Sequence, residues 1–503
     1  MSYATFSFIL RIRTSQPGRI PEWTYRGVRE RVPVRNDKVT LMRQCLRREE
    51  MRNRNNGNIN TRSFNRRLFQ MALPITIQSL MLALVAAADA LMLGRIGQNE
   101  MTAVSLATQI QFIQNMILSA IAGAGAILGS QYYGKGDRRS MQDLFHMILR
   151  FCALVSILFF GACELFPGLL MRVFTHDEEL IRIGSTYLRI AGWSYLITGI
   201  SQSYLTMMKV SGHVLESAMI SSSAVISNIF FNAVFIFGLL GAPRLGSRGA
   251  AAATTLSRAI ELGLCIGIST RKSFLRPDLR RIWQGNRLLF KDFFRQCLPL
   301  AGGALLWGVG FTSYTAIMGH MGTDAAAANS VSAVVRDLIC CVCNGIAGAA
   351  GIMVGNELGA GRLEAGKAYG IRLKNISWFI GFGSTAVILA LTPLVRSFVK
   401  LTETANGYLT GMMVIMAVYM IGRCVNTVTI NGVLDGGGDT VFDMYSLAVS
   451  MWGIAIPLAL LGAFVFHWPV LVVYACTCLD EVGKIPWVMI RFRKYRWVQN
   501  LTR

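Results

Sequence analysis

The sequence predicts an all-α membrane protein with about twelve transmembrane helices in two parallel six-helix lobes. Its composition is the first indication, since the 503 residues are 53% hydrophobic and 15% charged, with a mean hydropathy of +0.45. Soluble domains carry about 25% charged residues. Long uncharged stretches such as 101–134 are the second indication, because a helix crosses a bilayer with about 20 apolar residues. An internal repeat is the third.

Apolar blocks of spanning length follow one another along the chain, separated by short polar segments. Each block predicts one membrane helix. We expect helices over residues 68–94, 101–133, 142–170, 180–208, 213–240, 247–270, 290–320, 323–355, 365–396, 405–433, 440–467 and 469–490.

The formal net charge of +23 is unevenly placed. Basic residues crowd the N-terminal segment and every second loop, as in 135–139, 271–287, 362–374 and 491–496, whereas loops such as 319–324 are poor in Lys and Arg. This alternation follows the positive-inside rule, so we expect both termini in the cytoplasm, an even number of helices and a location in the inner or plasma membrane. It also argues against nucleic-acid binding, which a basic soluble protein would suggest.

These boundaries divide the chain into five parts. Residues 1–67 are predicted to be a basic cytoplasmic tail that contacts membrane lipid at most, or a misassigned start whose true first residue is Met42 or Met51. The N-terminal lobe spans 68–270 and the C-terminal lobe 290–490. A basic linker, 271–289, joins them, and 491–503 form a second basic tail.

The repeat appears when the chain is compared with itself at an offset of 225 residues. Positions 73–136 and 298–361 then align without a gap, with 14 identities in 64 positions. The Leu73-Pro74 pair falls on Leu298-Pro299, and Gly134 falls on Gly359. An even number of helices in each half keeps the two repeats parallel, an arrangement in which transporters commonly bind substrate between the halves.

Several short sequence patterns follow one another along the chain in an order that is specific to one transporter family. They are Leu73-Pro74 followed by Asp89 and then 94–97, the run 129–137, Asn228 and Asn232 before 236–238, the segment 249–254, and the glycine-rich exit 434–440. On these patterns the chain resembles the multidrug and toxic compound extrusion (MATE) family over residues 64–495.

The resemblance implies two lobes in a V shape around a central cavity, with export of small organic compounds driven by entry of Na⁺ or H⁺. It implies no cofactor and no enzymatic activity. It also implies a cation-coupling site made of Asp89, Asn228, Asn232 and Thr254. Position 232 is Asn where the family pattern has Asp, which leaves the coupling ion open; Na⁺ bound transiently there is the only metal that we expect.

A second family arrangement places the acids on the seventh and tenth helices. In this chain the predicted seventh helix has no carboxylate after Asp292, near its start, and the tenth has none before Asp435. That arrangement is therefore not expected here.

The position of Asp89 within a predicted membrane helix marks it as a functional candidate, independently of the resemblance. A carboxylate deep in a spanning helix is costly unless it is paired, protonated or hydrated, and such residues are usually functional. Desolvation disfavours the charged form, which suits a proton-coupled carrier. The repeat places Tyr314 at the equivalent position, so the scaffold does not require an acid there. A purely structural Asp that bonds neighbouring helices is the alternative.

The two Asn residues and the two prolines also have two readings each. Asn228 and Asn232 lie one helical turn apart, so they could ligate an ion or join helices by hydrogen bonds. Pro74 and Pro299 are predicted to kink their helices. The resemblance implies a functional bend at Pro74, whereas its repetition at Pro299 favours a scaffold role.

Other charges within the helices are candidates for a cavity wall. Arg258 and Glu261 are spaced to form an ion pair, whereas the adjacent Arg336 and Asp337 are expected to face different directions. Arg423 lies alone in its helix and requires a carboxylate or a hydrated cavity. We expect Glu357 to be solvated near a helix end. Three residues of the last helix are expected to pair locally: Asp480, Glu481 and Lys484.

The favoured function is therefore secondary efflux of cationic or amphiphilic organic compounds by antiport against H⁺ or Na⁺, with alternating access between lobes of a monomer. An ATP-driven pump is not supported, because residues 129–135 match a P-loop only until Gly136 replaces the required Ser or Thr. Two rivals remain. A lipid-linked oligosaccharide flippase would use Arg258, Arg336 and Arg423 to hold pyrophosphate, and a channel would show no coupling.

Overall fold

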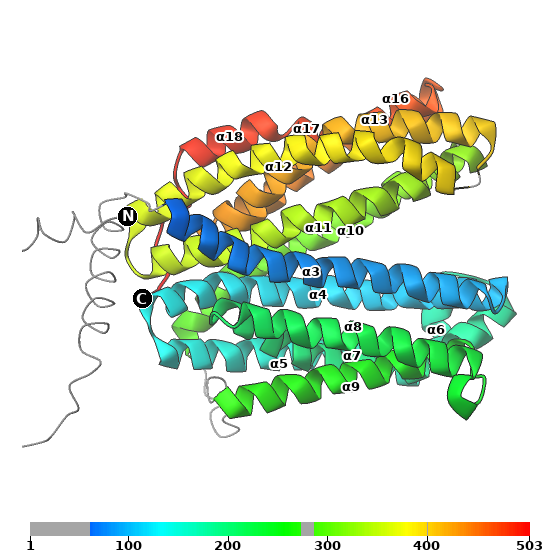
Figure 1. Cartoon of the computed structure of the whole chain (residues 1–503), viewed down its shortest axis with the longest axis horizontal. Helices are drawn as coiled ribbons and strands as arrows, with labels where there is room; N and C mark the ends of the chain where they lie inside the picture. Colours follow the sequence, from blue (N-terminus) through cyan, green and yellow to red (C-terminus); the bar gives the residue numbers. More distant parts are fainter. Residues whose placement is uncertain (1–60, 273–285, 400, 503) are drawn as a thin grey trace, which may run out of the picture. The chain divides into compact units, whose positions relative to one another are not determined.

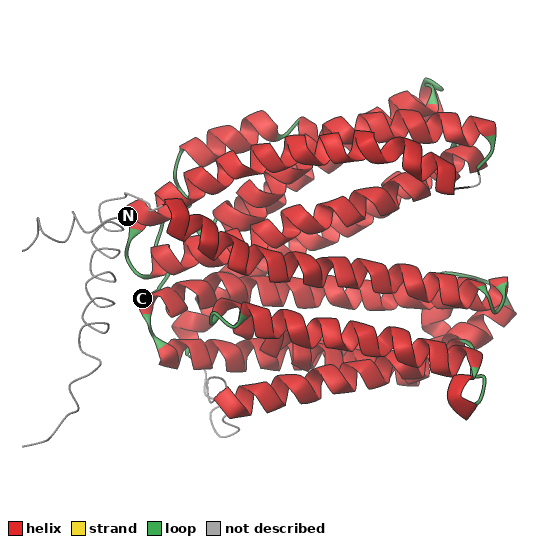
Figure 2. Ribbon diagram, viewed as in Figure 1, coloured by secondary structure: helices red, strands yellow, loops and turns green. Residues whose placement is uncertain are grey.

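The computed structural model describes residues 61–272, 286–399 and 401–502, which belong to one compact unit of the chain. Every regular element among these residues is a helix (Figure 2). The predicted N-terminal tail up to residue 60 and most of the predicted linker, 273–285, lie outside the described residues.

Six long helices form the N-terminal lobe. In it α7 packs mainly against α4, α5 and α9, while α8 packs mainly against α3 and α9. Their bounds are α3 Thr61–Gly94, α4 Gln98–Lys135, α5 Arg138–Leu165, α7 Glu178–Val210, α8 Val214–Phe237 and α9 Ser247–Lys272, with the short α6 Pro167–Arg172 and the 3₁₀ turn η1 Leu239–Gly241 between them.

The C-terminal lobe repeats this order with more interruptions. It begins with α10 Arg287–His320, α11 Thr323–Gly359, α12 Leu363–Phe398 and α13 Glu403–Asn426, the last continuing as the π-helix η2 Thr427–Leu434. The next span consists of α14 Thr440–Leu447, η3 Ala448–Ala455, α15 Ile456–Leu460 and η4 Leu461–Val465, and the final span of α16 Val470–Thr477, α17 Leu479–Val482 and α18 Ile485–Arg493.

The predicted all-α membrane fold is confirmed, and each predicted range is mostly helical. Ten helical segments within the described residues are long and apolar enough to span a membrane. The remaining two predicted spans are α7, which buries five Ser and Thr side chains between 194 and 206, and the final span, which is broken at Cys478 and Gly483. The first helix begins at Thr61, before the predicted residue 68.

Tight turns between helices follow from local sequence. Gly136 ends α4 in the left-handed conformation, with φ of 80°, which costs glycine little. Asp137 then caps α5 by accepting a hydrogen bond from the Ser140 amide at 3.0 Å. The polar run 134–140 therefore reverses the chain in the space of a few residues.

The two lobes meet through α3 and α4 on one side and α10 and α11 on the other (Figure 1). At the end that carries the basic loops, α4 and α11 approach until their backbones touch. A Cβ at Gly134 would collide with the Asn356 carbonyl, and a Cβ at Gly359 would collide with the Gln131 backbone. These contacts are related by the repeat, because Gly359 and Asn356 stand 225 residues after Gly134 and Gln131. The interface is therefore pseudo-twofold, with a small-residue spacing that permits close helix packing.

Glu357 adds a buried ion-pair cluster to the same interface. Its side chain is fully buried and pairs with Arg362 at 2.6 Å and with Arg67 of α3 at 3.3 Å. The prediction that Glu357 is solvated was wrong. The residue lies near a helix end, but that end packs against the other lobe and not against water.

The residues after α18 connect the lobes at this end of the molecule. Trp497 is fully buried, and Gln499 Nε2 donates to the Gly437 carbonyl at 3.0 Å. The Leu501 amide donates to Gln131 Oε1 at 2.7 Å, while Gln131 Nε2 donates to the Gly436 carbonyl at 3.1 Å. The interval predicted as a C-terminal tail thus packs on both lobes.

We predict that Gly134→Ala lowers the midpoint of thermal unfolding, since the added methyl meets backbone and overpacking costs about 1–3 kcal/mol. Gly161→Ala in α5 is the matched control, because a Cβ there meets nothing within 4 Å. The control should be neutral or stabilising by about 0.5–1 kcal/mol. Equal midpoints for both variants, measured on purified protein in detergent, would contradict the interface contact.

Candidate functional site

The structure brings together the four residues predicted for cation coupling. Asn232 Nδ2 of α8 donates to Asp89 Oδ1 of α3 at 2.6 Å and to Asn228 Oδ1 at 3.0 Å. Asn228 Nδ2 donates in turn to Thr254 Oγ1 of α9 at 3.3 Å. Three helices of one lobe are therefore joined by a single polar network that starts at the carboxylate.

Burial and local helix geometry hold this network in place. Asn228 and Asn232 are 6% and 1% exposed, and their separation of four residues puts both on one face of α8. Ser257, which the sequence analysis did not single out, also accepts from Asn228 Nδ2 at 3.4 Å. It lies one turn after Thr254 on α9, so helical spacing from Thr254 could have identified it.

One atom of the network is left over. Asn232 Oδ1 is buried and accepts no hydrogen bond from the described residues. The site thus offers a carboxylate, amide oxygens and hydroxyl oxygens, which are suitable ligands for a hard cation and suitable acceptors for a protonated carboxyl.

Both predicted proline positions lie inside continuous helices. Pro74 is within α3 and Pro299 within α10. A cavity of about 600 Å³ adjoins Pro74 and is also lined by Gln70 of the preceding turn and by Asn356 of the other lobe. A proline leaves the carbonyl four residues earlier without its helical partner, so space at this point permits α3 to bend. The kink itself stays a prediction.

Arg258 and Glu261 form the predicted ion pair, with 2.8 Å between Nη1 and Oε2. Glu261 is 2% exposed and also accepts from Ser201 Oγ at 3.4 Å. The pair joins α7 to α9, and it lines neither the cavity within the C-terminal lobe nor the cavity between the lobes, both described below.

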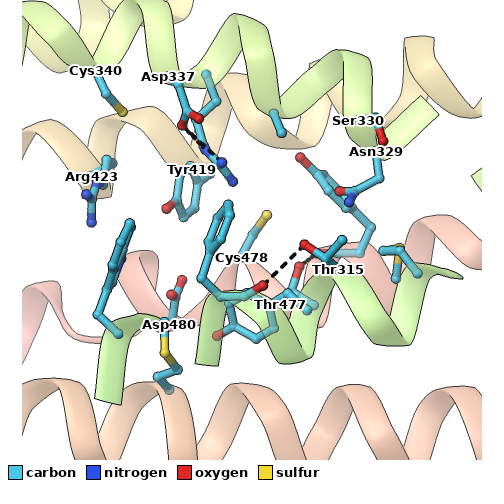
Figure 3. A pocket seen from close by; sticks show the side chains of 18 of the residues that line it. Thr315, Asn329, Ser330, Asp337, Cys340, Tyr419, Arg423, Thr477, Cys478 and Asp480 are labelled. Atoms are coloured by element: carbon cyan, nitrogen blue, oxygen red, sulfur yellow. Dashed lines mark hydrogen bonds and ion pairs between the residues drawn. The ribbon is translucent and has the colours of Figure 1, made fainter. Parts of the chain in front are cut away.

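A cavity of about 370 Å³ lies within the C-terminal lobe, among α10, α11, α13 and the broken last span (Figure 3). Its wall combines aromatic, charged and small polar side chains. The aromatic and charged members are Trp307, Phe311, Tyr314, Tyr419, Tyr474, Arg336, Asp337, Arg423 and Asp480.

Arg336 and Asp337 pair, contrary to the prediction that these neighbours face different directions. Both Nε and Nη2 of Arg336 donate to Asp337 Oδ1 at 3.0 Å. The long Arg side chain curls back, and its guanidinium lies over the Phe311 ring at 4.5 Å from the centroid. Flexible side chains thus bring together two groups whose Cβ atoms diverge.

Arg423 finds the carboxylate that its depth requires. Its Nη1 lies 2.7 Å from Glu481 Oε1, and Lys484 Nζ lies 3.0 Å from Glu481 Oε2. Asn426 Nδ2 donates to the same carboxylate at 2.8 Å. The predicted local pairing of Glu481 and Lys484 is confirmed, but the sequence analysis missed their link to Arg423, since 58 residues separate the partners.

A second cavity, of about 330 Å³, lies where the lobes face each other. Ser119, Ala120 and Gly123 of α4 form one wall, while Arg423, Asn426, Asp443, Glu481 and Lys484 contribute to the opposite wall. Trp307 and Arg423 line both cavities, so the two share a boundary. Asp443 was not among the residues predicted from the sequence.

Comparison with known proteins assigns the chain to a family. The family model MatE matches twice, over residues 74–234 and 299–461, one match in each lobe. The uncharacterized transporter YisQ of Bacillus subtilis is 24% identical over 446 residues, covering 86% of this chain and 95% of that protein. A probable multidrug resistance protein NorM of Mesorhizobium japonicum is 26% identical over 417 residues, covering 79% and 86%.

Solved structures share the fold. The Vibrio cholerae MATE transporter VcmN in its bent form superposes with a TM-score of 0.78 at 16% identity, covering 86% of this chain and 97% of that one. A MOP superfamily transporter from Pyrococcus furiosus superposes with a TM-score of 0.77 at 16% identity, covering 86% and 96%.

Two family matches in register with the internal repeat account for both lobes of the membrane fold. The chain is therefore a multi-pass membrane transporter, not an enzyme, and it belongs to the MATE family.

Proposed function

We propose that the chain exports small organic compounds from the cytoplasm in exchange for H⁺ or Na⁺, with Asp89 as the coupling group. The observation that carries this proposal is the network from Asp89 through Asn232 and Asn228 to Thr254. An ion that binds or leaves Asp89 alters hydrogen bonds on three helices at once. Such a change can bias the lobe between two arrangements.

The network can reverse its polarity when Asp89 changes charge. In the structure Asn232 donates to Asp89, which suits an ionised carboxylate. A protonated Asp89 needs an acceptor, and a half-turn of the Asn232 amide would present its unpaired Oδ1. Asn228 can turn in the same way and donate to Asn232, while Thr254 and Ser257 hydroxyls donate to it. Protonation of Asp89 would thereby change the hydrogen bonds throughout this network of side chains.

The same oxygen atoms could also bind Na⁺, the alternative coupling ion. Asp89, Asn228, Asn232 and Thr254 could present one carboxylate and three neutral oxygens to Na⁺ after the two amides turn. A single negative charge gives weaker electrostatic attraction than the two acids of the family pattern. We therefore keep H⁺ and Na⁺ as alternatives that experiment separates.

Alternating access is supported by the interface between lobes. The Gly134 and Gly359 contacts close the end that carries the basic loops. The positive-inside rule places that end in the cytoplasm. The 330 Å³ cavity between the lobes would then face away from the cytoplasm, as expected for a carrier that has released its substrate outside.

The flippase alternative loses its main support in the charge pairing. Arg258, Arg336 and Arg423 were the residues that could hold pyrophosphate, and each is paired with a carboxylate. An arginine that is already neutralised contributes little net attraction for a multiply charged anion. The geometry therefore favours a small organic compound over a pyrophosphate-linked lipid oligosaccharide as the substrate.

Asp89→Asn is expected to abolish coupling, because Asn keeps the shape of the side chain but cannot exchange a proton or attract a cation. Gradient-driven efflux of a fluorescent dye from proteoliposomes should fall to the level of protein-free vesicles. Glu178→Gln, which removes an exposed carboxylate from the same lobe, is the control and should transport normally. Unchanged efflux by Asp89→Asn would refute the role of Asp89.

The Asn232→Asp variant should strengthen dependence on Na⁺, since it places a second carboxylate next to Asp89. One further charge at this distance should lower the half-saturating Na⁺ concentration by about tenfold or more. The measurement is efflux at fixed pH with Na⁺ varied against choline at constant ionic strength. Native protein that responds to pH but not to Na⁺ would identify H⁺ as the coupling ion.

A channel is distinguished by the same vesicles. An antiporter moves ions in the direction opposite to its substrate. Substrate added to one side of the vesicle membrane should therefore dissipate an imposed pH or Na⁺ gradient. Dye flux without any effect on either gradient would contradict antiport and favour the uncoupled alternative.

A further inference from the structure

The cavity of about 600 Å³ beside Pro74 lies at the end of the molecule that carries the basic loops. Four segments line it there: residues 67–74 of α3, Tyr133 near the end of α4, residues 212–215 at the start of α8, and Asn356 near the end of α11. Figure 1 shows that α3 begins at this end and runs between the lobes. The polar network of Asp89 does not extend to this cavity, so the cavity is without a role in the proposed coupling.

The lining of this cavity changes from polar to apolar along α3. Arg67 is the last charged residue before the uncharged stretch 68–88, so it marks the level at which lipid headgroups meet hydrocarbon. Beyond it the cavity is lined by Phe69, Leu73 and Leu215, which are 65%, 43% and 59% exposed. A charged group at the headgroup level followed by exposed apolar side chains suits an amphiphile with an acidic head and a hydrocarbon tail.

The charge at the polar end of the cavity favours an anion. Arg67 is the one charged side chain among the described residues that line it. Behind Arg67 the fully buried Glu357 pairs with both Arg67 and Arg362, at 3.3 and 2.6 Å. Two guanidinium groups against one carboxylate leave one formal positive charge. A guanidinium has five N–H donors in a fork that matches phosphate, and the Arg67 side chain is 30% exposed.

Uncharged polar groups surround the same end of the cavity. Gln70 is exposed and follows Arg67 by three residues, so the two side chains are neighbours on the surface of α3. Tyr133 is 43% exposed, and a Cβ at Gly212 would lie 3.1 Å from its hydroxyl oxygen. Tyrosine is enriched at the level of lipid headgroups, where its ring is in hydrocarbon and its hydroxyl in the polar layer. These groups can bond the phosphate and glycerol oxygens of a lipid.

The first helix is held against α8 on the membrane side of the cavity. Gln78 Nε2 of α3 donates to Ser221 Oγ of α8 at 2.8 Å, and both residues are buried. Gln78 lies one turn beyond Pro74, the last residue of α3 that lines the cavity. The space is therefore a groove between α3 and α8 that ends before the middle of the membrane.

The internal repeat shows that the fold does not require a basic residue at this position. Asp292 of α10 stands 225 residues after Arg67, so the C-terminal lobe has the opposite charge at the equivalent place. The positive end of the groove is thus a feature of one lobe only, as expected for a binding site and not for a scaffold contact.

We propose that the groove between α3 and α8 binds an anionic phospholipid, with its phosphate at Arg67 and an acyl chain along Phe69, Leu73 and Leu215. A single negative charge, such as that of phosphatidylglycerol, neutralises the surplus positive charge of the Glu357 cluster. Phosphatidylcholine carries an additional cation, which Arg67 repels. Because the Arg67–Glu357 pair joins the lobes, the bound lipid lies against the contact between them.

Two lipids with the same acyl chains and different headgroups test the proposal. The purified full chain is equilibrated in mixed micelles that contain equal mole fractions of phosphatidylglycerol and phosphatidylcholine, and native mass spectrometry counts the lipids that it retains. Native protein should retain phosphatidylglycerol in preference. Arg67→Gln should lower its retention by about fivefold or more, since one basic residue near an anionic lipid contributes about this factor. Retention of phosphatidylcholine should not change.

The adjacent Arg66 provides the matched control. It is exposed and does not line the cavity, so Arg66→Gln removes the same charge from the same helix and should keep the native preference. Equal loss of phosphatidylglycerol in both variants would show a diffuse attraction to basic residues and would overturn the site.

A second variant leaves the Glu357 cluster intact and carries the test if Arg67→Gln fails to fold. Gln70→Glu places a negative charge beside the phosphate position on an exposed residue, so it should also remove the preference for phosphatidylglycerol. Gln98→Glu makes the same change on an exposed residue at the opposite end of the molecule and should have no effect. An unchanged preference in folded Arg67→Gln or Gln70→Glu would contradict the proposal.

Inorganic phosphate distinguishes a lipid site from a site for a free anion. Added in excess to native protein, it should not displace phosphatidylglycerol, because it has no acyl chain to cover Phe69, Leu73 and Leu215. Displacement by phosphate alone would identify a free-anion site and overturn the lipid. All these measurements are made without an ion gradient, so their outcome does not depend on antiport.

Discussion

The close approach of α4 and α11 is the constraint on which the arrangement of the lobes depends. It requires the absence of a Cβ at Gly134 and Gly359, positions that the repeat makes equivalent. Because each glycine packs against the backbone beside the other, neither lobe can move without affecting both contacts. The Glu357 ion pairs and the residues after α18 surround the same point. One end of the molecule is thereby held shut by short-range contacts between backbones.

The polar groups of the two lobes do not follow the internal repeat. In the N-terminal lobe the first helix carries Asp89, and the amides of α8 satisfy it. In the C-terminal lobe Tyr314 takes that position, and the acids that line the cavities lie on α11, on α14 and on the broken last span. The π-helical segments η2, η3 and η4 occur only in this lobe among the described residues. π-helical turns often accompany functional sites, and Asn426 with Thr427 at the start of η2 lines the cavity between lobes.

Most of the fold and the Asp89 cluster could be predicted from the sequence, because they depend on local signals. Spanning helices follow from apolar length, and the spacing of Asn228 and Asn232 places both amides on one face. Other features depend on contacts between distant segments. Arg423 and Glu481 pair across 58 residues, and Glu357 is buried by the opposite lobe. The prediction for Arg336 and Asp337 was wrong for another reason. The direction of the Cα–Cβ bond does not determine where the end of a long, flexible side chain lies.

The contacts of residues 497–501 with both lobes constrain how the lobes can separate during transport. Leu501 donates to Gln131 of one lobe, while Trp497 and Gln499 pack on the other. If the lobes separate at this end, these residues must release at least one lobe, so the strength of their contacts would set how readily the lobes part there.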